Sequence, residues 1–92
     1  PIFPIGDVDE RLGVQDQVFG VVLEDGTPIA FGVDAAAAVL ASGGTVELGG
    51  VSLRLDGGGV RATDATGAEI EGHQAFWFAW SQFMPDTLLW EP

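Results

Sequence analysis

One segment, HQAFWFAWSQFMPDTLLW at residues 73–90, holds all three tryptophans and three of the six phenylalanines of this chain. Within it, four residues recur at the spacing i, i+3, i+4 and i+7, which predicts a helix over residues 74–84: Phe76, Ala79, Trp80 and Phe83. Three more apolar residues occupy the rest of the circumference: Trp77, Phe78 and Met84. A helix that is apolar all round must be buried on more than one side.

The end of this segment is set by a proline. Pro85 disfavours helical backbone at Met84, so we expect DTLLW, residues 86–90, to continue in extended form. The predicted aromatic helix is therefore short and is followed by a strand.

Glycine-containing turns divide the middle of the chain into strands. Residues 17–24 and 27–33 are β-rich runs on either side of Asp25-Gly26, which predicts a β-hairpin. Apolar and polar residues then alternate along TVELGGVSLRLDGG. Val46, Leu48, Val51, Leu53 and Leu55 share one face, as expected of half-buried strands joined at Gly49-Gly50.

Three further elements complete the expected order. In DAAAAVLASGG, Asp34 is expected to cap a short helix that stops at Gly43-Gly44. Strands are expected near residues 60–63 and 68–70, with a turn between them. We therefore predict an α+β fold: an antiparallel β-sheet made of a hairpin plus a meander, with two short helices, the second rich in aromatic residues.

The two prolines of PIFPIG, Pro1 and Pro4, indicate an extended arm or an edge strand before the hairpin. We expect residues 1–92 to form a single small domain. A chain of this length buries only a thin core, and glycine-rich turns make it rich in loops.

Charge excludes several classes of partner. The chain has fourteen Asp and Glu residues but only three arginines and no lysine, which gives a net charge of -11. Three arginines do not form a basic face for phosphates, so we expect no nucleic-acid partner and no anionic membrane surface. The acidic excess fits either a high-salt habitat, in which carboxylates are screened, or the solubility of a secreted protein. No apolar run reaches the roughly 20 residues of a membrane span, so we expect no membrane insertion.

The closing residues, GHQAFWFAWSQFMPDTLLW, resemble the ending of domain-of-unknown-function family 3179, a bacterial and archaeal group. The resemblance lies in FWFAW at residues 76–80 and in Phe83, Pro85, Asp86 and Thr87. Upstream, FPIGDVDERLGVQDQVFGVVLEDGTPIAFGV is similar to a looser recurring stretch of that family. The resemblance implies kinship with the closing, C-terminal region of a larger exported or surface-associated protein, and hence an extracytoplasmic or cell-surface location.

Two departures from the family pattern limit what the resemblance implies. Longer members carry a paired-cysteine stretch, whereas this chain has no cysteine, and Met84 stands where many members have histidine. No catalytic residue is therefore carried over.

The aromatic residues are the candidate partner-binding residues, because large aromatic side chains are favoured at interface centres. Not all of them can share one helix face. We expect Phe76, Trp80 and Phe83 to lie in the core, and Trp77, Phe78 and Trp90 to contact a partner chain or the rest of a parent protein.

Candidate metal ligands are weak. His73 is the single histidine and lacks a second nitrogen or sulfur ligand, so a residue at the end of the aromatic helix is the simpler interpretation. Asp7 and Asp9 of DVDE, like the carboxylates of DATGAEIEG, carry oxygen ligands but do not follow calcium-loop spacing. We expect solvated acidic faces, no metal site and no cofactor.

Two functions remain open. The first is a non-enzymatic extracytoplasmic interaction or assembly module, since one histidine and three serines without a motif assemble no catalytic set. The partner is then a second copy or the rest of a parent protein. The alternative is a small-ligand or metal-handling domain in which Trp77, Trp80 and His73 line a pocket and the chemistry depends on another region or chain.

Overall fold

The computed structural model describes residues 12–13, 16–57 and 59–92. Its strands and helices follow one another in the order β1 Gln17–Val22, β2 Pro28–Gly32, α1 Val33–Ala41, β3 Val46–Leu48, β4 Val51–Asp56, β5 Gly59–Thr63, β6 Glu69–Ile70, β7 His73–Phe76, α2 Trp77–Phe83 and β8 Leu88–Trp90. The predicted α+β fold, with a hairpin, a meander and two short helices, is confirmed.

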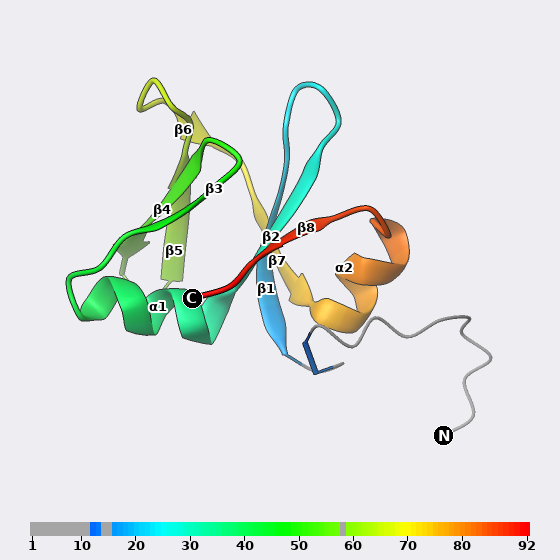
Figure 1. Cartoon of the computed structure of the whole chain (residues 1–92), viewed down its shortest axis with the longest axis horizontal. Coiled ribbons are helices and arrows are strands. Elements are labelled where there is room, and N and C mark those ends of the chain that lie inside the picture. Colours follow the sequence, from blue (N-terminus) through cyan, green and yellow to red (C-terminus); the bar gives the residue numbers. More distant parts are fainter. Residues whose placement is uncertain (1–11, 14–15, 58) are drawn as a thin grey trace.

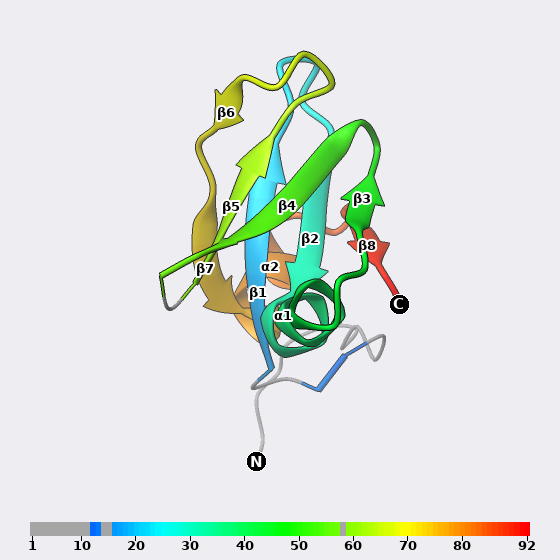
Figure 2. The ribbon, with the colours of Figure 1, turned by 90° about the vertical axis from the view of Figure 1, so that its left-hand side faces the viewer.

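The strands form two four-stranded sheets (Figure 1), ordered β7-β1-β2-β8 and β3-β4-β5-β6. We call them the first and the second sheet. The second sheet crosses in front of the first in Figure 2, with α1 at one end of the layer between them. Among the described strands all pairs are antiparallel except β2 and β8, which run parallel, with Ala30 opposite Leu89. One antiparallel sheet was expected. The structure instead has two sheets, and the pair of β2 and edge strand β8 in the first sheet is parallel.

The first sheet is covered on both faces. Alternate residues of β1 and β2, such as Val21, Ile29 and Phe31, pack with α1 and the second sheet. The residues between them, such as Val18 and Ala30, pack against α2. This double burial explains why QVFGVV and PIAFG are almost continuously apolar, whereas a strand with one wet face alternates.

The second sheet has one face in the core and one in solvent. Val46, Val51, Leu53 and Ala62 are buried against the first sheet. Glu47, Arg54 and Arg61 are exposed on the other face. The predicted alternation is confirmed, except that Leu55 lies beyond the cover of the first sheet and is 43% exposed.

The turns form at the glycine pairs at which the sequence predicts them. Gly49 and Gly50 both have positive φ, 63° and 84°, as a two-residue hairpin loop between β3 and β4 requires. Helix α1 ends in a Schellman motif, in which the N–H of Gly44 donates to Val39 O at 2.9 Å and that of Gly43 to Leu40 O at 3.1 Å. Asp34 is not the cap that was expected, because the N-cap is Gly32. Asp34 lies in the first helical turn, where its negative charge interacts favourably with the positive end of the helix dipole.

The predicted aromatic helix begins later than expected. Residues His73–Phe76 form strand β7, which pairs with β1 and extends the first sheet. The helix starts at Trp77, whose N–H donates to Asp16 O at 2.7 Å. Pairing with β1 supplies backbone partners that an isolated helical turn lacks, so tertiary structure overrides the helical spacing at Phe76.

Within the described ranges, no helix is both long and apolar enough to cross a membrane.

Candidate functional site

Helix α2 is attached to the first sheet by its two tryptophans. Trp77 is 0% exposed and Trp80 is 8% exposed, and both pack on Val18 and Ala30. The indole N–H of Trp80 donates to the Thr87 hydroxyl oxygen at 2.8 Å, so the polar atom of the buried ring has its partner. These two tryptophans belong to the core.

The burial of Trp77 corrects the expectation that it contacts a partner. Because the helix starts at Trp77, its sheet-facing stripe consists of the buried Trp77, Trp80 and Ser81 and continues to the partly buried C-cap residue, Met84. These four residues also have the spacing i, i+3, i+4 and i+7. Two residues expected in the core lie outside this stripe: Phe76 is 50% exposed and Phe83 is 82% exposed. That expectation was wrong for both.

The other two predicted partner residues retain some accessibility. Phe78 is 41% exposed on α2. Trp90, on β8, is partly buried, and its ring lies 6.4 Å from that of Phe31, centroid to centroid. Contact with a partner stays a prediction for both residues.

The side of α2 away from the sheet carries Phe78, Ala79, Gln82 and Phe83, and we call it the outer face of α2. All four residues are exposed or partly exposed. No charged residue occurs between Gly72 and Pro85, although the chain as a whole carries a net charge of -11. The outer face is therefore an uncharged, aromatic part of a strongly acidic molecule.

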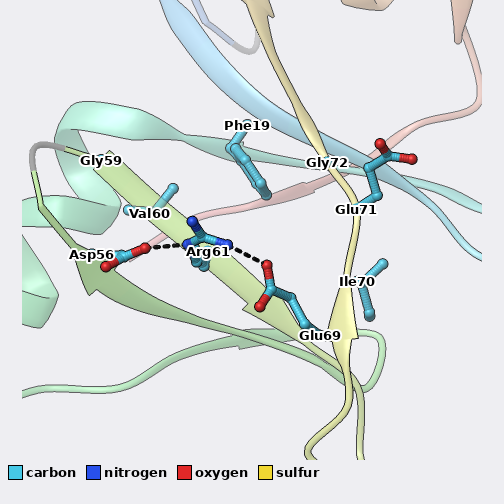
Figure 3. Close-up of a pocket in the computed structure, with 9 residues that line it drawn as sticks. All are labelled: Phe19, Asp56, Gly59, Val60, Arg61, Glu69, Ile70, Glu71 and Gly72. Carbon is cyan, nitrogen blue, oxygen red and sulfur yellow. Dashed lines mark hydrogen bonds and ion pairs between the residues drawn. The ribbon is translucent and has the colours of Figure 1, made fainter.

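A second candidate site is a cleft between the two sheets, of about 370 Å³ (Figure 3), which we call the β5–β7 cleft. Its apolar lining consists of Phe19, Val60 and Ile70. Its charged lining consists of Asp56, Arg61, Glu69 and Glu71. The chain leaves the second sheet for β7 at Gly72, where a Cβ atom would stand 2.4 Å from the Phe19 ring, so glycine permits this close approach.

Arg61 is held between two carboxylates on the rim of this cleft. Its Nη1 group donates to Glu69 Oε2 at 2.5 Å, and its Nε–H donates to Asp56 Oδ2. These hydrogen bonds, first that to Asp56 and then that to Glu69, raise the pKa of the Arg61 guanidinium above its ordinary value. Sequence reasoning missed this cleft, because nothing in the strand pattern shows where β5 and the following chain separate.

Of the three metal candidates, His73 lies among the described residues. His73 lies on β7 opposite Gly20 and is exposed. Asp7 and Asp9 lie outside the described residues. Among the residues that are described, no group of three His, Asp or Glu side chains is arranged to hold a metal ion. Trp77, Trp80 and His73 do not line the β5–β7 cleft, and a pocket formed by these three residues stays a prediction.

In the acidic turn DATGAEIEG, the first carboxylate, Asp64, accepts hydrogen bonds from residues of the same turn. Asp64 Oδ1 accepts hydrogen bonds from the Thr66 hydroxyl at 2.6 Å, from Thr66 N at 2.9 Å and from Ala68 N at 3.0 Å. The bond from the Thr66 side chain contributes most to lowering the pKa of Asp64. This carboxylate closes the turn between β5 and β6.

Comparisons with protein-family models, with curated protein sequences and with solved structures gave no match. The resemblance to family 3179 stays a prediction from the quoted motifs.

Proposed function

We propose that this protein is a non-enzymatic assembly module and that the outer face of α2 contacts a second copy of the chain. The observation that carries the proposal is the exposure of two phenylalanines, Phe83 at 82% and Phe78 at 41%, on a face of α2 without charge. Interface centres are depleted in charged residues and enriched in aromatic ones. An extracytoplasmic location, implied by the resemblance, stays a prediction.

The charge of the chain favours this face as the place where two copies meet. Two molecules of net charge -11 repel each other at most orientations, and the repulsion weakens as salt screens it. The segment from Gly72 to Pro85 adds no charge to such a contact. Self-association through the outer face of α2 is therefore expected to strengthen with ionic strength.

The experiment is light scattering after size-exclusion chromatography, in low and in molar salt, on the protein and on the variant F78S/F83S. The protein is expected to form a discrete oligomer in molar salt, and the variant a monomer with unchanged circular dichroism. The control is V22S/L55S, which removes two exposed apolar side chains away from α2: Val22 of β1, 45% exposed, and Leu55 of β4, 43% exposed.

A protein that is monomeric in both salts contradicts the proposal. So does a variant F78S/F83S that keeps the mass of the unmodified oligomer, or a control that loses it equally.

A further inference from the structure

Strand β5 has an edge that β6 covers over only part of its length. Ala62 pairs with Ile70 and Thr63 with Glu69, whereas no described strand pairs with the same edge at Gly59, Val60 and Arg61. If the register continued, Gly72 would stand opposite Val60. Instead the chain turns away at this point and joins the first sheet as β7, which opens the β5–β7 cleft (Figure 3).

The backbone of Val60 points into this opening. Hydrogen-bonded pairs alternate along an antiparallel ladder. Asp64 N donates to Ala68 O at 2.9 Å, so Ala62 and Ile70 form the next hydrogen-bonded pair of the ladder, and Val60 is the following position. Its N–H and C=O are therefore directed away from β4, as the donor and acceptor that an added strand needs.

The two sides of this edge differ in chemistry. Toward the core, Phe19, Val60 and Ile70 present apolar surface. Toward solvent and on the rim, the carboxylates of Asp56, Glu69 and Glu71 outnumber the one guanidinium, Arg61. A strand that lies here alternates its side chains between these two environments, because successive side chains point to opposite faces.

We propose that the open edge of β5 binds an extended, positively charged peptide segment by strand addition. Apolar side chains of the peptide face Phe19 and Val60 in the cleft, and its lysine or arginine side chains face the carboxylates of Asp56 and Glu69. Main-chain hydrogen bonds to Val60 supply the pairing. A second copy of this acidic chain is a poor occupant, because the same edge of that copy carries the carboxylates of Asp56, Glu69 and Glu71 beside it.

The test uses the full chain and three peptides. The probe is acetyl-Lys-Val-Lys-Val-Lys-amide, the charge control replaces each Lys by Glu, and the backbone control is the probe with N-methylated valines, which lack the ladder donors. Amide NMR spectra at low salt are expected to shift at residues 59–61 and 69–72 with the probe. N-methylation is expected to weaken binding by roughly fivefold or more, as the loss of main-chain hydrogen bonds implies.

Two variants separate a site from general attraction to an acidic protein. Glu69→Gln removes a carboxylate beside the edge, and Glu47→Gln removes one from β3 on the same sheet, two strands away from β5. Weaker binding by Glu69→Gln than by Glu47→Gln supports the proposal. It is overturned if both variants weaken binding equally, if the N-methylated peptide binds as well as the probe, if the shifts lie elsewhere, or if residues 59–61 pair with a second copy without peptide.

Discussion

The ring of Trp80 lies directly on Gly20, at a distance that leaves no room for a side chain. A Cβ atom built on Gly20 would stand 2.4 Å from Cζ3 of Trp80 and 2.5 Å from Cη2. Gly20 is buried in the middle of β1, on the face that α2 covers. The absence of one side chain on β1 thus decides how closely α2 packs on the first sheet.

Gly20→Ala is expected to destabilise the fold by at least about 1–3 kcal/mol, the usual cost of overpacking a core, because the Trp80 ring must move. The control is Gly59→Ala, since a Cβ at Gly59 meets no atom within 4 Å. Urea unfolding followed by Trp emission measures both free energies. Equal stability of the two variants would show that α2 is not packed on Gly20.

Thr87→Val keeps the shape of a buried side chain but removes the oxygen that accepts the indole N–H of Trp80 at 2.8 Å. The unpaired N–H is expected to cost about 1–3 kcal/mol of unfolding free energy. In the background Trp80→Phe, which has no N–H to satisfy, the same change is expected to cost less. A double-mutant cycle measures the difference, and a coupling energy of zero would contradict the bond.

The division of α2 into a buried and an exposed side predicts unequal effects of alanine. Trp77→Ala is expected to cost about 3–5 kcal/mol because it empties a fully buried site, whereas Phe83→Ala is expected to change the unfolding free energy by less than about 0.5 kcal/mol. Denaturant titrations at low salt compare the two. A large loss for Phe83→Ala in the monomer would place that ring in the core after all.

The turn closed by Asp64 gives a pH dependence. Its pKa is lowered in the folded chain from the ordinary 3.8, so its ionised form adds stability above that pH, and this stability is lost as the pH falls through the folded value. Asp64→Ala is therefore expected to be less stable than the unmodified protein at pH 7, and the difference is expected to shrink toward about pH 3. The control is Glu24→Ala, an exposed carboxylate outside this turn. A difference that stays constant across this range would contradict the role of the ionised carboxylate.

The sequence predicts the local features of this fold well. The glycines of the turns and of the Schellman motif have roles that depend on their own backbone angles, so Gly43, Gly49 and Gly50 mark real chain reversals. The alternation of apolar and polar residues in the second sheet is visible in the sequence because one face of this sheet is exposed to solvent. The continuous apolar runs of β1 and β2 carried a further signal, burial on both faces, from which a second layer is inferred.

What the sequence does not show depends on contacts between distant segments. The spacing of Phe76, Trp80 and Phe83 fits a helix as well as that of Trp77, Trp80 and Met84, and only the pairing of β7 with β1 decides where the helix starts. Contacts between distant segments also decide the parallel pairing of β8 with β2 and the separation of the chain from β5 at Gly72. For this reason Phe76 and Phe83, which are exposed, were expected in the core, and the β5–β7 cleft was not expected.

Assembly through the outer face of α2 can be observed in an isotope-filtered nuclear Overhauser experiment on a mixture of labelled and unlabelled chains in molar salt. It detects contacts between molecules and none within one. Intermolecular contacts are expected from the rings of Phe78 and Phe83, and none from the buried Trp77. Contacts confined to strand edges, or no intermolecular contact at millimolar protein, would contradict assembly through the outer face of α2.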